Sequence, residues 1–142
     1  MYRSTVIFLC LLGGDLFRLH KIYFPINVRN IHWILGLVDL KAKTIQVYDS
    51  LGRDRREYVD YIWEYLSEEH ATKQLKPLNR GNWRFLDQPM ETPLQGNGDD
   101  CGVFVCMYSY FLSLELPFTF NQTHIETIRK LIILSLVQGE IE

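Results

Sequence analysis

The first half of the chain alternates short apolar runs with polar breaks, a spacing typical of β-strands. Residues 21–28 predict one strand, and Pro25 within it places that strand at a sheet edge or a bulge. Residues 33–40 and 44–48 are two further β-rich runs, and residues 41–43 between them are polar enough and short enough to form a turn. The pattern therefore predicts a β-hairpin that follows an edge strand.

The middle of this hairpin is unusually apolar. Residues 34–38 are apolar almost without a break, as expected of a strand that is covered on both faces. Gly36 lies inside this run, and a glycine in a strand interior indicates that another chain segment approaches closely there.

Helical spacing begins after Asp54, which is in place to cap the next element. Apolar residues then recur every three or four positions, with acidic residues on the other faces; they are Tyr58, Val59, Ile62, Trp63 and Leu66. Residues 83–86 predict a short strand. Residues 102–116 are apolar on nearly all sides, which predicts a central buried helix that Pro117 stops.

The last element is predicted from a cap and a stripe. Thr123 and Glu126 have the spacing of a capping box. The apolar residues behind them recur at helical spacing and predict a final helix; they are Ile125, Ile128, Ile132 and Leu136. Strands in the middle of the chain, packed between helices, predict an α+β domain.

Composition narrows the class of protein. The chain has 142 residues, enough for one domain with one core, and 47% of them are hydrophobic. Its net charge of −2 and the absence of a Lys/Arg cluster give no sign of a surface that binds nucleic acid or a membrane. The three cysteines and four histidines match no zinc spacing, so we expect no metal. We also expect no cofactor and a monomer. Reduced thiols favour the nucleus or the cytoplasm.

Residues 1–14 do not continue these patterns. Residues 6–12 are apolar behind one arginine, but the run is too short to span a bilayer, and Gly13-Gly14-Asp15 is a poor cleavage site for a signal peptide. A buried strand or the start of a helix is the favoured interpretation, with a secretory signal or a mis-set start as alternatives. We therefore divide the chain into an atypical apolar leader, 1–14, and a main region, 15–142.

Cys101 is the first candidate for chemistry. It follows the acidic, glycine-broken loop 95–100 and directly precedes the predicted buried helix, which places its thiol at a helix start. The positive end of the helix dipole favours a thiolate, the nucleophilic form of cysteine. A buried structural thiol is the alternative, and it is the favoured interpretation for Cys106, five residues later on another helix face.

His32 and Asp49 are candidates as a pair. His32 starts the first strand of the predicted hairpin and Asp49 ends the second, so the two lie at the same end of the hairpin. A carboxylate bonded to one ring nitrogen leaves the other nitrogen free to face a thiol. The remaining histidines have no such partner in the sequence, and we expect them at the surface or in caps; they are His20, His70 and His124.

Gln95 and Trp33 complete the predicted site. Gln95 lies on the loop before Cys101, where its amide, with the backbone N–H of Cys101, is in place to hold an oxyanion; a surface glutamine is the equal alternative. Trp33 is either a core residue or the wall of a groove beside His32.

These segments resemble the ubiquitin-like-protein proteases, the cysteine peptidases that process SUMO and release it from conjugates. The similarity lies in residues 31–39, 47–52 and 95–104, in the order His, Asp, Gln, Cys, and in the closing helix around 128–130. It covers roughly residues 15–138.

The resemblance implies a papain-like fold with the cysteine last in sequence. It implies Cys101 as nucleophile, His32 as general base and acid, Asp49 as the residue that orients it, and Gln95 in the oxyanion hole. It also implies that Trp33 covers a narrow channel for the substrate's Gly-Gly tail, which suits residues without a Cβ. The implied function is cleavage after the C-terminal diglycine of SUMO or a related ubiquitin-like protein.

The front of the chain departs from the family pattern. Family domains begin further upstream, with segments that hold the ubiquitin-like body, and residues 1–14 do not resemble them. We therefore expect a shortened copy or an incomplete gene model. Three alternatives follow: a weakly active or inactive copy that only binds a ubiquitin-like partner, a NEDD8-specific protease, and acetyl transfer by the same constellation.

Overall fold

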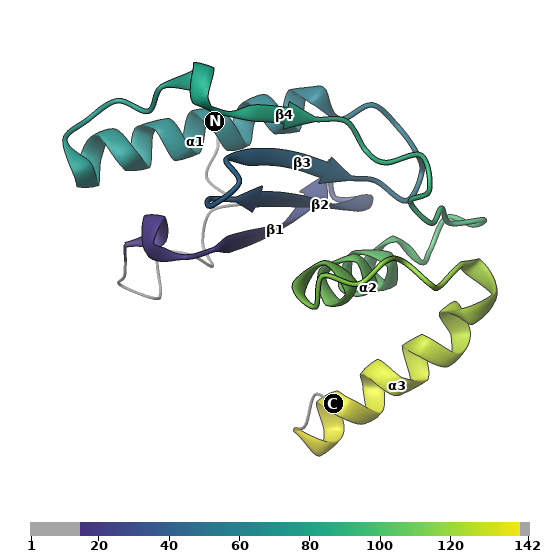
Figure 1. The fold of residues 1–142 in the computed structure, drawn as a ribbon. Coiled ribbons are helices and arrows are strands. Elements are labelled where there is room, and N and C mark those ends of the chain that lie inside the picture. Colours follow the sequence, from purple (N-terminus) through teal and green to yellow (C-terminus); the bar gives the residue numbers. More distant parts are fainter. Residues whose placement is uncertain (1–14, 140–142) are drawn as a thin grey trace.

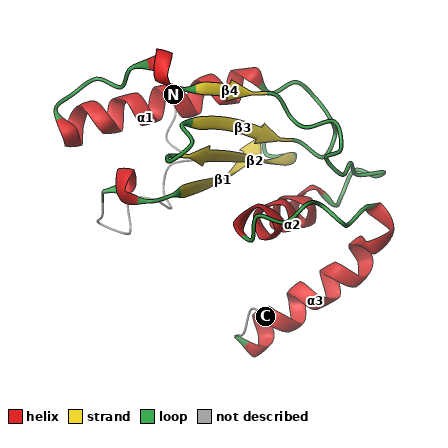
Figure 2. Cartoon of the chain, viewed as in Figure 1, coloured by secondary structure: helices red, strands yellow, loops and turns green. Residues whose placement is uncertain are grey.

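The computed structural model describes residues 15–139, and these form an α+β fold, as predicted (Figures 1 and 2). Within these residues, four strands make one sheet, and the remaining elements are three helices and three short 3-10 turns. The strands and α-helices are β1 (Lys21–Val28), β2 (His32–Asp39), β3 (Thr44–Tyr48), α1 (Arg56–Gln74), β4 (Arg84–Leu86), α2 (Cys101–Ser113) and α3 (Ile125–Gln138).

The sheet has the order β1-β2-β3-β4 and is mixed. β1, β2 and β3 are antiparallel, while β4 pairs with β3 in parallel. The predicted edge strand and hairpin are therefore confirmed, and Pro25 lies in the edge strand β1, where its missing N–H costs least. The register sets Leu35 opposite Tyr48 in the hairpin.

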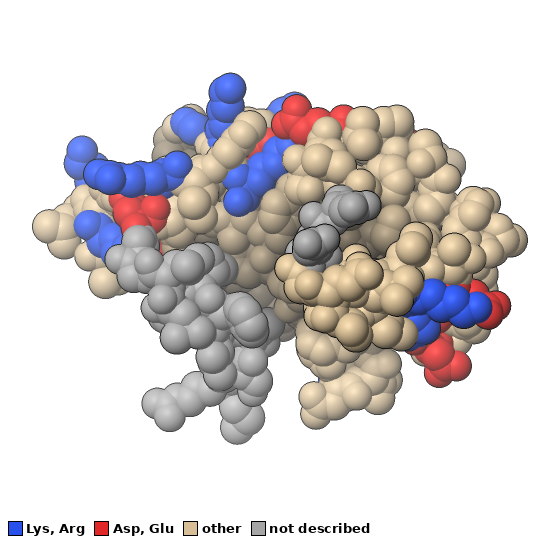
Figure 3. All heavy atoms as spheres, turned by 90° about the horizontal axis from the view of Figure 1, so that it is seen from below, with Lys and Arg blue, Asp and Glu red and all other residues tan. Residues whose placement is uncertain are grey.

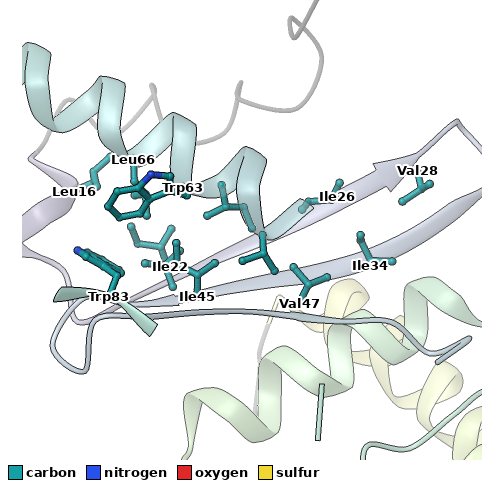
Figure 4. Packing of buried hydrophobic residues seen from close by; sticks show 13 residues of the cluster. Leu16, Ile22, Ile26, Val28, Ile34, Ile45, Val47, Trp63, Leu66 and Trp83 are labelled. Carbon is teal, nitrogen blue, oxygen red and sulfur yellow. The ribbon is translucent and has the colours of Figure 1, made fainter. Parts of the chain in front are cut away.

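The two faces of the sheet are covered by different helices. α1 packs on one face, around a core that includes Ile34, Ile45 and the helix residues Trp63 and Leu66 (Figure 4). α2 packs on the other face. The predicted close approach at Gly36 is confirmed, because a Cβ placed there would lie 2.5 Å from Cδ1 of Ile62 in α1.

The prediction of a helix buried on all sides is wrong for α2. The helix ends at Ser113, and its buried residues lie on the side that faces the sheet and the aromatic segment after the helix. Tyr110 and Leu114 are exposed. Apolar composition on every face predicted the helix but not its surroundings, because burial depends on which other elements cover each face.

The predicted helix caps are partly corrected. Asp54 does accept the backbone N–H of Arg56, at 2.9 Å, so it supports the start of α1. The expected capping box of Thr123 and Glu126 is not formed. Instead Asn121 accepts the N–H of Thr123, at 2.9 Å, and begins the 3-10 turn Gln122–His124 that leads into α3.

The predicted apolar stripe on the last helix is also only partly buried. Ile125 is the buried residue of α3, whereas Leu136 is 75% exposed. The helix is present as predicted. Ile128 and Ile132 of its stripe are half-buried against the core around α2, and the exposed part is the C-terminal end of the stripe.

The leader 1–14, including Cys10, lies outside the described residues. Among residues 15–139, no helix is both long and apolar enough to span a membrane. The same part of the chain contains no cluster of three or more histidine, cysteine or acidic side chains arranged to bind a metal ion.

Candidate active site

His32 and Asp49 meet at one end of the hairpin. His32 is the first residue of β2, and Asp49 follows the last residue of β3. Because Leu35 is opposite Tyr48, Asp49 comes level with Ile34, and His32 is its diagonal neighbour on the same face. The distance from His32 Nε2 to Asp49 Oδ1 is 2.6 Å, so the predicted pairing of these two residues is confirmed.

Both partners of this pair are buried. Asp49 is fully buried and His32 is 7% exposed. An ionised carboxylate only accepts hydrogen bonds, so Nε2 carries the proton in this pair and Nδ1 is left as an acceptor. The imidazole is thus oriented with one free basic nitrogen.

Three donors surround the Asp49 carboxylate. Besides His32, the Leu51 N–H donates to Oδ1 at 2.8 Å and Arg55 Nε donates to Oδ2 at 2.7 Å. Burial of this carboxyl favours its neutral form, but the hydrogen bonds from the Leu51 amide, His32 and Arg55 outweigh burial and lower its pKa. The carboxylate therefore stays charged opposite the imidazole.

Gln88 holds the backbone of Asp49. Its side-chain Oε1 accepts the N–H of Asp49 at 2.6 Å, and its Nε2 donates to the carbonyl oxygen of Asp49 at 3.1 Å. Neither Gln88 nor Arg55 was predicted from the sequence as a site residue. Arg55 lies six residues after Asp49, within reach of a local turn, so its charge was a usable signal. Gln88 lies 39 residues away and has no local signal.

Cys101 is the first residue of α2, as predicted, and is 7% exposed. The loop that carries it is fastened beside Asp49, because the N–H of Gln95 donates to the carbonyl oxygen of Ser50 at 2.8 Å. The start of β2, the end of β3 and the loop leading to α2 lie at the same end of the sheet (Figure 1).

A second carboxylate, that of Asp100, anchors this loop. It accepts hydrogen bonds from Asn97 at 2.7 Å, from Gln122 at 2.8 Å and from Arg129 at 2.5 Å. These hydrogen bonds lower the pKa of the Asp100 carboxyl. The bond from Gln122 has the largest effect, followed by those from Asn97 and Arg129. The residue directly before Cys101 is thereby tied to α3.

Gln95 and Trp33 lie at the edges of this arrangement. Gln95 Oε1 accepts a hydrogen bond from the Ser50 hydroxyl, and its Nε2 donates to the carbonyl oxygen of Asn97 at 2.5 Å. An amide nitrogen carries two protons, so one remains for another acceptor. Trp33 follows His32 on β2 and is 40% exposed.

The other histidines lie apart from this site. His20 is exposed, and Nδ1 of His124 accepts the N–H of Asn121 in the turn before α3, so the predicted surface and capping roles are confirmed for these two. His70 is half-buried instead, and its Nδ1 lies 2.6 Å from the carbonyl oxygen of Lys76. Cys106 lies on the exposed side of α2, so it is on another face than Cys101, as predicted, but it is not a buried core thiol.

Comparison with known proteins identifies the family. Residues 12–135 match the model of the Ulp1 protease family, C-terminal catalytic domain. The chain is 33% identical to human Sentrin-specific protease 2 over 130 residues, which is 91% of the chain and 22% of that protein. It is 34% identical to yeast Ubiquitin-like-specific protease 1 over 104 residues, which is 73% of the chain and 16% of that protein.

Solved structures show the same fold. The Ulp1-like SUMO protease catalytic domain of Chaetomium thermophilum superimposes with a TM-score of 0.78 at 22% identity, covering 90% of the chain and 49% of that domain. The yeast Ulp1 protease domain in complex with Smt3, the yeast ortholog of SUMO, gives a TM-score of 0.68 at 30% identity, with 86% and 54% covered.

The chain thus spans about a fifth of the length of the curated relatives and about half of the solved domains. The family match nevertheless covers most of the chain and includes every residue of the site described above. On this evidence the chain belongs to the Ulp1 protease family of cysteine proteases, within the family's C-terminal catalytic domain.

Proposed function

We propose that this chain is a thiol protease that cleaves peptide or isopeptide bonds after the C-terminal Gly-Gly of SUMO or a related ubiquitin-like protein. The observation that carries the proposal is the buried His32–Asp49 hydrogen bond of 2.6 Å, at the same end of the sheet as the loop before Cys101. The relatives named for SUMO and sentrin proteolysis support the substrate class.

Cys101 is the nucleophile in this proposal. Its thiolate attacks the carbonyl carbon of the last glycine and forms a C–S bond, which makes a tetrahedral intermediate with a negative oxygen. The N–H of Cys101 is among the first amides of α2, which have no partner within the helix, and it donates to that oxygen together with Gln95.

His32 moves the protons. Its Nδ1 takes the proton of the thiol, and the resulting imidazolium gives it to the leaving amine as the C–N bond breaks. Water then attacks the thioester while His32 takes a proton from it. The C–S bond breaks, which releases a diglycine carboxylate and restores the thiolate. Asp49 holds the ring and stabilises the imidazolium.

Trp33 supplies the substrate groove. Its ring is 40% exposed and follows His32 in the sequence, so it offers a flat apolar wall, and a Gly-Gly tail is narrow enough to pass close to such a wall because glycine has no Cβ. The site is therefore specific for diglycine ends because the space beside the nucleophile is too narrow for residues that carry a Cβ.

A SUMO protein that ends in an electrophilic diglycine derivative tests this proposal. We expect a covalent adduct on Cys101, mapped by peptide mass spectrometry, and its loss in the Cys101→Ala variant. Non-covalent binding without an adduct would instead support a copy that only binds its partner. The same derivative of NEDD8, compared at equal concentration, identifies which ubiquitin-like protein is preferred.

A further inference from the structure

The Asp49 carboxylate is shared between two side chains, those of His32 and Arg55. Its Oδ1 serves His32 Nε2 at 2.6 Å and the Leu51 N–H at 2.8 Å, while its Oδ2 is taken by Arg55 Nε at 2.7 Å. Because each oxygen has its own partners, the carboxylate cannot rotate without breaking a hydrogen bond in a buried place, where such losses are costly.

We propose that Arg55 is a positioning residue of the active site, which holds Asp49 Oδ2 so that Oδ1 stays aligned with His32 Nε2. This inference rests on the proposed function, in which His32 is the acid and the base. Gln88 supports the same alignment from the backbone, since it holds both the N–H and the carbonyl of Asp49.

Arg55 is itself well fixed. It is the residue that flanks the start of α1, so its backbone is anchored by the helix, and its guanidinium lies 5.9 Å from the centre of the Tyr58 ring. Its side chain is 11% exposed. A planar guanidinium held in this way presents its Nε–H in one direction, which a flexible ammonium does not.

The far side of Arg55 opens toward a cavity. Arg55 and Gln88 line a cavity of about 470 Å³, together with Arg53 and other residues of the loops on either side. A small cation can therefore reach the place of the guanidinium when the side chain is shortened. The cavity makes the inference testable by chemical rescue.

The first experiment compares Arg55→Ala, Arg55→Lys and Arg53→Ala on a diglycine-linked fluorogenic substrate. We expect Arg55→Ala to lower kcat by about tenfold to a hundredfold, because a misplaced acid–base group slows chemistry. KM should stay within about twofold, since Arg55 does not touch the substrate. Arg55→Lys should recover part of the loss, and added methylguanidinium should restore part of the Arg55→Ala rate.

Arg53→Ala is the matched control. Arg53 is exposed, lies in the same loop and lines the same cavity, and its loss changes the net charge equally. We expect its kcat to remain at the level of the unaltered chain. An equal loss of kcat in both variants, or an Arg55→Ala variant with full kcat, would overturn the inference.

A second readout does not depend on activity. The ring proton on Nε2 of His32 is sheltered by its hydrogen bond to Asp49, so it should give a downfield NMR resonance that exchanges slowly with water. We expect this resonance to broaden or disappear in Arg55→Ala and to persist in Arg53→Ala. An unchanged resonance in Arg55→Ala overturns the inference even if the chain cleaves no diglycine substrate. A chain that cleaves nothing but loses the resonance in Arg55→Ala contradicts only the proposed function.

Discussion

α1 and α3 both carry an apolar stripe, yet they lie in different surroundings. α1 buries Val59, Ile62, Trp63 and Leu66 against the sheet. α3 buries Ile125 and packs Ile128 and Ile132, both half-buried, against the core around α2. Five of its other apolar residues are more than half exposed; they are Leu131, Ile133, Leu134, Leu136 and Val137. The charged residues of α3 lie in its first half, and much of the face seen from below is free of charge (Figure 3).

The two helices belong to the two halves of the candidate site. The sheet with α1 carries His32 and Asp49, which are held by a buried set of hydrogen bonds above a continuous core. The Cys101 loop is held largely through Asp100 and its partner Arg129, whose side chain is 48% exposed. The acid–base pair is thus held by buried hydrogen bonds, whereas the loop before Cys101 is held by polar contacts that include the half-exposed Arg129, although α2 itself packs on the sheet.

The largest difference in activity is expected between variants of the two cysteines of α2, Cys101 and Cys106. Cys101→Ser should lower kcat/KM on a diglycine substrate by about 10⁴-fold or more, because a hydroxyl lacks the acidity and nucleophilicity of the thiol. Cys106→Ser should keep the rate of the unaltered chain, because Cys106 lies on the exposed side of α2. Comparable losses in the two variants would contradict the assignment of the nucleophile.

The comparison of α1 with α3 is tested by two leucines. Leu66→Ala should lower the free energy of unfolding by about 2–5 kcal/mol, because Leu66 is 0% exposed and its loss leaves a cavity. Leu134→Ala should change it by less than about 0.5 kcal/mol, since Leu134 is 52% exposed. Urea denaturation followed by circular dichroism measures both. Equal destabilisation would show that the α3 face is covered in solution.

Gln95 tests how the nucleophile loop contributes to chemistry. Gln95→Leu should lower kcat by about 10²-fold, because the amide donor to the oxyanion is lost. The variant also loses the side-chain hydrogen bonds of Gln95 with Ser50 and Asn97, while the backbone bond from its N–H to Ser50 remains, so the melting temperature is measured beside kcat to separate folding from chemistry. A variant with unchanged kcat would make Gln95 a surface residue without a catalytic role.

The smallest effect concerns the two carboxylates and pH. The pKa values of Asp49 and Asp100 are both lowered in the fold, so the unfolded chain binds more protons near and below pH 4. Their stabilisation should be complete above about pH 4 and disappear as the pH falls through the lowered values. Denaturation curves between pH 2 and pH 6 measure this loss.

Salt separates the two contributions. Asp49→Asn and Asp100→Asn should each flatten the dependence of stability on pH. High salt should weaken the Asp100 contribution, because its partner Arg129 is half exposed, and leave that of the buried Asp49 nearly unchanged. The same salt response for both would remove the distinction between the two halves of the site.

The sequence by itself determined the local elements and the pairing of His32 with Asp49. Alternating apolar residues and a short polar turn specify a hairpin, and the hairpin register brings its two open ends together. The same reasoning placed Cys101 at a helix start, because a glycine-broken polar loop precedes an apolar run. These are relations between neighbours along the chain, or between strands joined by one turn.

The tertiary structure alone decided what surrounds these elements. Gln88 forms hydrogen bonds with Asp49 across 39 residues of sequence. α3 leaves several of its later apolar residues exposed, although its spacing resembles that of α1. Asn121 replaced the predicted cap of the last helix. Burial and long-range hydrogen bonds depend on which surfaces meet after the chain has folded, and the spacing of residues within one segment carries no information about that.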